Sequence, residues 1–115
     1  MKANDFGKKW VQDWNSHDLE AIMTHYSEHI DFTSPFIQQM GIDAEGKITN
    51  KSQLKQYFSK ALEKYPDLHF DLHYELWGLR SVVLFYTSVN DLLSAEFMEL
   101  DEEHKVICVK AHYHS

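Results

Sequence analysis

The second half of the chain constrains the fold most, because it contains four extended segments joined by very short turns. The segments are "LHFDLHYELW", "SVVLFYTSV", "LSAEFMEL" and "KVICVKAHYH", and the turns are "GLRS", "VNDL" and "DEEH". Parallel strands need long crossover connections, so these segments are predicted to form an antiparallel meander. In the first segment, alternation predicts that one face carries Leu68, Phe70, Leu72, Tyr74 and Leu76.

The first half of the chain has helical periodicity. One predicted helix carries Phe6, Trp10 and Trp14 on one face, and a second follows over Leu19 to Tyr26. A third helix is predicted from Asn50 to Pro66, and its apolar face is formed by Leu54, Tyr57, Phe58, Ala61, Leu62 and Tyr65.

Between the second and third helices, "HIDFTSP" reads as a strand ended by Pro35, and "FIQQMGIDAEGKI" as a loop or loose hairpin with a short strand. The whole order predicts one α+β domain over residues 1–115, with helices covering one face of a curved antiparallel sheet.

Composition argues against several classes of function and location. The chain has 11 basic and 18 acidic residues and a formal net charge of −7, which argues against a nucleic-acid partner. The N-terminal segment "MKANDFGKKW" lacks an apolar signal core, and no apolar run is long enough to span a membrane. Cys108 is the only cysteine, so we expect no internal disulfide, a packed thiol and a reducing, cytoplasmic location.

Three quoted stretches together resemble one family: "WNSHDLEAIMTHYSEHIDFTSPF", "GKITNKSQLKQYF" and "AEFMELDEEHKVICVKAHY". In order and spacing they are similar to the small bacterial SnoaL-like proteins of the nuclear transport factor 2-like superfamily. The resemblance implies a cone-shaped sheet wrapped around the long helix, an N-terminal helical hairpin, and a cavity at the open end. It also implies a homodimer formed through the outer face of the sheet. Members include isomerases, cyclases, dehydratases and non-catalytic binding modules, so the fold alone does not decide function.

Among these relatives, the ketosteroid isomerases align without gaps over Trp10 to Pro35. Their catalytic base is an Asp directly before the proline, where this chain has Ser34. A neutral serine cannot abstract a carbon-bound proton without activation, so the resemblance disfavours steroid isomerase activity. Their oxyanion-hole Tyr matches Trp10, and their second catalytic Asp matches Glu96.

Glu96 is therefore the candidate catalytic residue. Strand alternation places it on the same face as Ser94 and Met98. If that face lines the cavity, burial would raise the pKa of Glu96 and let it exchange protons near neutral pH. The alternative is a structural carboxyl that is solvated at a rim or hydrogen-bonded to a Tyr or Trp.

Ligand binding is expected from bulky and polar side chains around the cone. The predicted set is Trp10, Trp14, Tyr26, Ser34, Phe36, Tyr57, Phe58, Tyr86, Met98 and Tyr113. For Trp14 and Phe58 the simpler interpretation is core packing, although core and pocket overlap in a cone of this kind.

Metal binding is not predicted. The chain has eight histidines, but their spacings offer no convincing trio of ligands, so we interpret them as solvated or interface residues. His112 and His114 alternate with Tyr113, which is expected to face the cavity. Arg80 is the only arginine and falls in a turn, which argues against a carboxylate–arginine relay.

These observations predict a protein that binds a small apolar or aromatic ligand, and they leave open whether it is an enzyme. Catalysis would be cofactor-independent, of isomerase, cyclase or dehydratase type, with Glu96 as acid or base. The alternative is a non-catalytic module that dimerises or docks a protein through its outer sheet. A binder or enzyme predicts an open cavity with Glu96 facing it, whereas an interaction module predicts a cavity filled by its own aromatic side chains.

Overall fold

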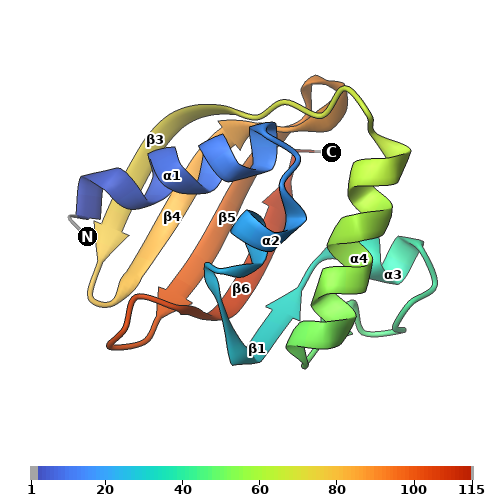
Figure 1. The fold of residues 1–115 in the computed structure, drawn as a ribbon, viewed down its shortest axis with the longest axis horizontal. Helices are drawn as coiled ribbons and strands as arrows, with labels where there is room; N and C mark the ends of the chain where they lie inside the picture. The colour runs from blue at the N-terminus through green and yellow to red at the C-terminus, as the bar shows by residue number, and fades with distance from the viewer. Residues whose placement is uncertain (1–2, 115) are drawn as a thin grey trace.

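The computed structural model describes residues 3–114 and has helices on one face of a curved sheet (Figure 1). The helices are α1 (Ala3–Asn15), α2 (Leu19–Met23), α3 (Pro35–Gln39), α4 (Lys51–Lys64) and a short 3-10 helix η1 (Val89–Asp91). The strands are β1 (Tyr26–Thr33), β2 (Lys47–Ile48), β3 (Asp71–Gly78), β4 (Ser81–Thr87), β5 (Leu93–Leu100) and β6 (Val106–Tyr113). The predicted α+β fold class is confirmed.

The sheet has the strand order β2-β1-β6-β5-β4-β3. Strands β3 to β6 form the predicted antiparallel meander. The pairing of β1 with β6 is parallel, so the sheet is mixed and its two halves come from opposite ends of the chain. No pattern in the sequence indicated that pairing.

The helical face of the sheet holds the core. Every second residue of β4 is buried beneath the helices, as is the matching set on β5. Helix α1 lies across β3 and β4 in Figure 1 and approaches β3 closely at Gly7. A Cβ added to Gly7 would lie 2.6 Å from Cδ of Glu75, and the Gly7 amide donates to Glu75 Oε1 at 3.0 Å.

Strand β3 departs from simple alternation. The register with β4 shifts between Leu72 and Tyr74, which is the signature of a β-bulge. Beyond the shift, Tyr74 and Leu76 are 64% and 59% exposed, and Glu75 and Trp77 turn toward α1. The prediction of one continuous apolar face is therefore wrong after Leu72, because one extra residue reverses the alternation.

The segment after β1 differs from the predicted loop in one respect. Ser34 has an extended backbone and its hydroxyl accepts a hydrogen bond from the Phe36 amide, so it caps the short helix α3. Pro35 stands at the first helical position, where its missing N–H costs nothing. The Ser-Pro pair therefore ends the strand and also begins a helix, and the predicted short strand β2 follows.

Candidate functional site

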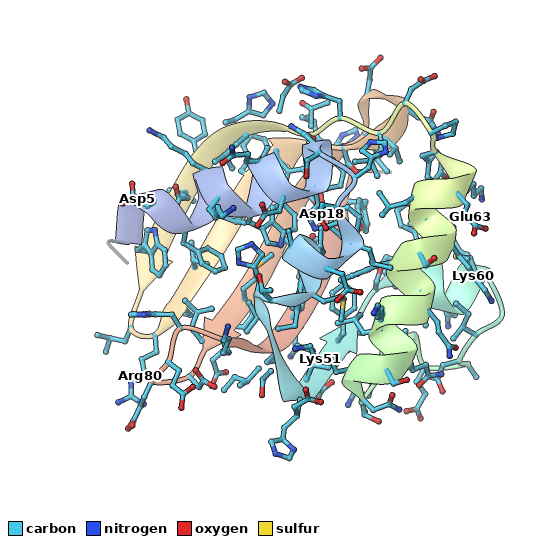
Figure 2. All side chains as sticks on the ribbon, viewed as in Figure 1. Asp5, Asp18, Lys51, Lys60, Glu63 and Arg80 are labelled. Atoms are coloured by element: carbon cyan, nitrogen blue, oxygen red, sulfur yellow. The ribbon has the colours of Figure 1, made fainter. Side chains whose placement is uncertain are left out.

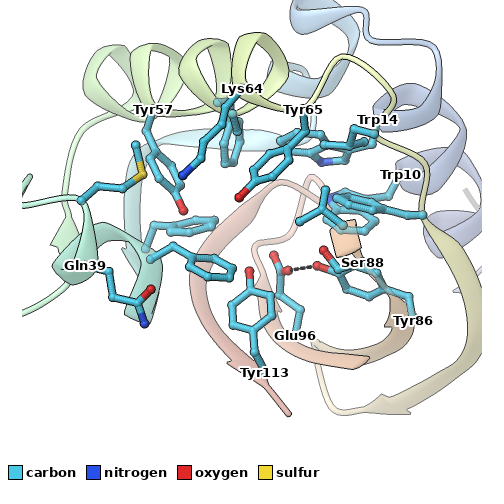
Figure 3. Close-up of a pocket in the computed structure, with 18 residues that line it drawn as sticks. Trp10, Trp14, Gln39, Tyr57, Lys64, Tyr65, Tyr86, Ser88, Glu96 and Tyr113 are labelled. Atoms are coloured by element: carbon cyan, nitrogen blue, oxygen red, sulfur yellow. Dashed lines mark hydrogen bonds between the residues drawn. The ribbon is translucent and has the colours of Figure 1, made fainter. Parts of the chain in front are cut away.

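A cavity of about 340 Å³ lies between α1, α3, α4 and the inner face of the sheet (Figure 3). Its wall is mostly aromatic, and its few polar groups come from several separate elements. The lining residues are Trp10, Trp14, Phe32, Phe36, Gln39, Met40, Tyr57, Phe58, Ala61, Lys64, Tyr65, Leu68, Phe70, Tyr86, Ser88, Val89, Glu96 and Tyr113. This volume and this lining are typical of small-molecule sites.

Glu96 supplies the only carboxyl group among those lining residues. It stands in the middle of β5, paired with Leu84 on β4 and Ala111 on β6, and is only 4% exposed. The Tyr86 hydroxyl donates a hydrogen bond to Glu96 Oε1 at 2.7 Å. Within residues 3–114, Oε2 receives no hydrogen bond, and Figure 3 shows the carboxyl group facing the cavity. One oxygen is therefore available to a ligand.

Burial raises the pKa of Glu96 to about 7, against a lowering by the hydrogen bond from Tyr86. The burial effect is larger because the surrounding aromatic wall cannot solvate a carboxylate as water does. Near neutral pH the group is therefore present both as acid and as carboxylate. A carboxyl in this state can donate a proton to a bound molecule or take one from it.

Tyrosine hydroxyls surround this carboxyl. Burial raises the pKa of Tyr86 and of Tyr113 well above the ordinary value, and the charge of Glu96 adds to both effects. Burial likewise raises the pKa of Tyr57 to about 12. These phenols stay protonated at neutral pH and can donate hydrogen bonds to a ligand oxygen.

Two indoles define the α1 side of the cavity. Trp10 Nε1 donates to the Tyr26 hydroxyl at 3.0 Å, which fixes the Trp10 ring edge-on to Tyr86. Trp14 packs edge-on against Phe58 with ring centroids 4.8 Å apart. The Trp14 Nε1 atom is buried and has no hydrogen-bond partner among the described residues.

Most of the predicted ligand-binding residues line this one cavity together with Glu96. They are Trp10, Trp14, Phe36, Tyr57, Phe58, Tyr86 and Tyr113. Tyr26, Ser34 and Met98 do not line it and are almost completely buried in the core. The Tyr26 hydroxyl accepts a hydrogen bond from Trp10, and the Ser34 hydroxyl caps α3. Met98 shares the inner face of β5 but lies two residues beyond Glu96, where that face packs into the core.

Several lining residues were absent from the sequence prediction. Lys64 follows Tyr57 and Ala61 at the i+7 and i+3 positions of α4, so helical spacing contained the signal for it. Gln39 ends α3 and Met40 is its C-cap, in a segment that was interpreted as a loop. Ser88 and Val89 lie where the predicted strand "SVVLFYTSV" meets the predicted turn "VNDL", and the structure places them at the start of η1.

One histidine corrects the interpretation of the whole set as solvated or interface residues. His25 is only 7% exposed, and its Nε2 atom lies 2.7 Å from Asp13 Oδ2 on α1. The His112 and His114 side chains are exposed, as predicted, and Tyr113 between them lines the cavity. Among residues 3–114, no three His, Cys, Asp or Glu side chains gather in a way that could hold a metal ion.

A curved sheet beneath a long helix is also the fold of a solved nuclear transport factor 2-like protein. A family model described as a SnoaL-like domain matches residues 8–89, and the chain belongs to this family. Within the part of the chain that the structure describes, no helix is long and apolar enough to cross a membrane.

Solved structures agree with this assignment. A SnoaL-like protein of unknown function from Burkholderia thailandensis is 34% identical, with a TM-score of 0.94 over 98% of this chain and 94% of that one. A candidate ketosteroid isomerase from Kribbella flavida is 15% identical, with a TM-score of 0.74 over 98% of this chain and 78% of that one. A candidate SnoaL-like polyketide cyclase from Shewanella denitrificans is 9% identical, with a TM-score of 0.74 over 97% and 90%. The search of curated proteins gives no match.

Proposed function

We propose that the protein binds a small, largely apolar carbonyl compound in its cavity and that Glu96 transfers a proton to or from it. The observation that supports this most strongly is a single buried carboxyl, with a pKa of about 7, on the wall of an otherwise aromatic cavity. Within residues 3–114, only Oε1 of Glu96 accepts a hydrogen bond, so Oε2 is available to a ligand. Such a site suits an isomerase or a related cofactor-independent enzyme.

In the proposed step, the Glu96 carboxylate removes a proton from the carbon next to the ligand carbonyl. The C–H electron pair moves to form a C=C bond, and the negative charge develops on the carbonyl oxygen. Neutral phenols such as that of Tyr113 would donate hydrogen bonds to that oxygen. The protonated Glu96 then returns a proton to the same or a conjugated carbon, so the reaction needs no oxidant or cofactor.

Proton exchange on a neutral ketone tests this proposal. We expect wild-type protein to bind 2-acetonaphthone and to speed the exchange of its methyl hydrogens for deuterium in D₂O, as followed by NMR. The rate should rise with pH around 7 as the carboxylate forms. Glu96→Gln should still bind the ketone but slow its exchange roughly 100-fold or more, the usual contribution of a general base.

The control is Glu103→Gln, which changes an exposed carboxyl in the turn between β5 and β6 and should exchange like wild type. Binding without faster exchange would limit the protein to ligand binding. Failure to bind the ketone at all would refute the proposed site.

The outer face of the sheet supports a second proposal, which concerns assembly. We infer that two copies pair through this face, where Tyr74 stacks on Phe85 with ring centroids 6.2 Å apart and Leu76 is also exposed. Glu99 and Lys110 stand on the neighbouring strands β5 and β6 of the same face. A two-fold axis would let Glu99 of each copy meet Lys110 of the other, so the face is complementary to itself.

A further inference from the structure

The mouth of the cavity contains one positive charge. Tyr57, Ala61 and Lys64 lie at successive turns on one face of α4, and all of them line the cavity. Among the lining residues, Lys64 is the only Lys, Arg or His. The cavity therefore has a cation on its α4 side and the carboxyl of Glu96 on the sheet side, with aromatic rings between them (Figure 3).

Lys64 is held at the cavity instead of being paired elsewhere. Its Nζ atom lies 5.5 Å from the centroid of the Tyr65 ring, an attractive cation–π contact. Within residues 3–114 it forms no ion pair, whereas Lys51 and Lys55 on the same helix each face a glutamate. Figure 3 shows the Lys64 side chain extending over the cavity between Tyr57 and Tyr65.

Helix α4 is locally basic, although the chain as a whole has a formal net charge of −7. Four lysines and one glutamate lie on this helix, so the α4 side of the cavity favours anions. An anionic group that enters the mouth meets the ammonium of Lys64 and the protonated hydroxyl of Tyr57 on the same helical face. Together these two groups supply donors for both oxygens of a carboxylate.

We propose that the ligand is a flat aromatic or alicyclic ketone that carries a carboxylate at the end opposite the carbonyl, and that Lys64 binds this carboxylate. This inference rests on the proposed function, since it assumes that the carbonyl end lies beside Glu96. Lys64 would then select acids over neutral analogues and orient the carbonyl toward the proton-transferring group. It is a binding residue, and it takes no part in moving the proton.

Matched naphthalene probes test the proposal. We expect wild-type protein to bind 6-acetyl-2-naphthoate roughly tenfold more tightly than its neutral methyl ester, the usual size of one charge-assisted contact. Fluorescence titration measures both dissociation constants. Because Lys64 is exposed to solvent, added salt should weaken binding of the acid and leave the ester unaffected.

Two variants separate the ligand contact from a general effect of charge or stability. Lys64→Gln should remove the preference for the acid while leaving ester binding and the melting temperature close to wild type. Lys60→Gln removes a charge one turn earlier, where Figure 2 shows the side chain directed away from the body of the molecule. This control should keep the preference intact.

The outcomes distinguish the two proposals. Equal binding of acid and ester by wild-type protein, or an unchanged preference in Lys64→Gln, would overturn the role of Lys64. Ketone binding and proton exchange could still hold in that case. If neither naphthoate nor 2-acetonaphthone binds, the cavity site itself is wrong and both proposals fail.

Discussion

At the scale of single residues, the buried carboxyl of Glu96 has a thermodynamic cost. Its pKa is about 7 in the folded protein, against an ordinary value of 4.5. The folded state therefore binds this proton more tightly than the unfolded state does. The contribution of Glu96 to stability is fully present below the unfolded pKa of 4.5 and is lost as the pH rises through about 7.

Glu96→Gln should remove this pH dependence. Gln keeps an oxygen to accept the Tyr86 hydrogen bond but cannot ionise, so it avoids the cost of a buried carboxylate. Relative to wild type, its free energy of unfolding should increase by about 3 kcal/mol between about pH 4.5 and about pH 8. Urea unfolding of both proteins across that range measures the difference. A constant difference would mean that Glu96 has an ordinary pKa.

The residue scale also shows what the sequence could reveal about the site. Alternation along a strand grouped Glu96 with Ser94 and Met98 and predicted that His112 faces outward, but it left open which face of β5 lines the cavity. It could not reveal the partner of His25, because Asp13 is 12 positions away and the pairing depends on how two elements pack. The same reason applies to the capping role of Ser34, which required knowing that α3 exists.

At the scale of elements, a buried polar contact fixes α1 to the start of β1. The Asp13 carboxylate on α1 accepts hydrogen bonds from Lys9 at 2.9 Å and faces His25 at 2.7 Å. Burial alone would raise the pKa of Asp13, but the bonds from Lys9 and His25 together lower it. Burial also lowers the pKa of His25, with Asp13 opposing the effect. Near neutral pH, Asp13 is thus a carboxylate and His25 a neutral imidazole whose Nε2–H donates a hydrogen bond to it.

Breaking this contact should loosen α1 and with it the indole wall of the cavity. Asp13→Ala leaves the buried His25 ring without its partner, and we expect a loss of about 2 kcal/mol in the free energy of unfolding. Asp67→Ala, which changes an exposed carboxylate, should cost far less. Chemical denaturation compares the two. Equal effects would show that the contact contributes little to stability.

At the scale of the whole molecule, the sheet has two different faces. The inner face meets the helices and encloses the cavity, and the outer face exposes Tyr74, Leu76 and part of Phe85. Cys108 lies half-buried in β6, and burial raises its pKa, so its thiol stays protonated. Alternation predicted the two sets of residues on β5 and β6, while the bulge in β3 moved two further apolar residues to the outer side.

The proposed assembly predicts the effect of one charge. Phe85→Glu places a carboxylate in the middle of the outer face, where burial against a second copy would cost much of the binding free energy. Sedimentation should show a dimer for wild type and a monomer for the variant. Both proteins should still bind 2-acetonaphthone. Glu28→Gln, an exposed change on β1, serves as the control and should remain dimeric. A monomeric wild type would exclude this interface.

The parallel pairing of β1 with β6 also affects how the molecule is made. Tyr26 pairs with Val106 and Phe32 with Val109, so contacts that close the sheet join residues far apart in sequence. Such contacts form slowly, because a long loop must be ordered before they are made. During synthesis, β1 lacks this neighbour until β6 has left the ribosome, and Tyr113 emerges after the other residues that line the cavity. During synthesis, a ligand therefore cannot assist the folding steps that precede the emergence of β6, since its complete binding site includes Tyr113.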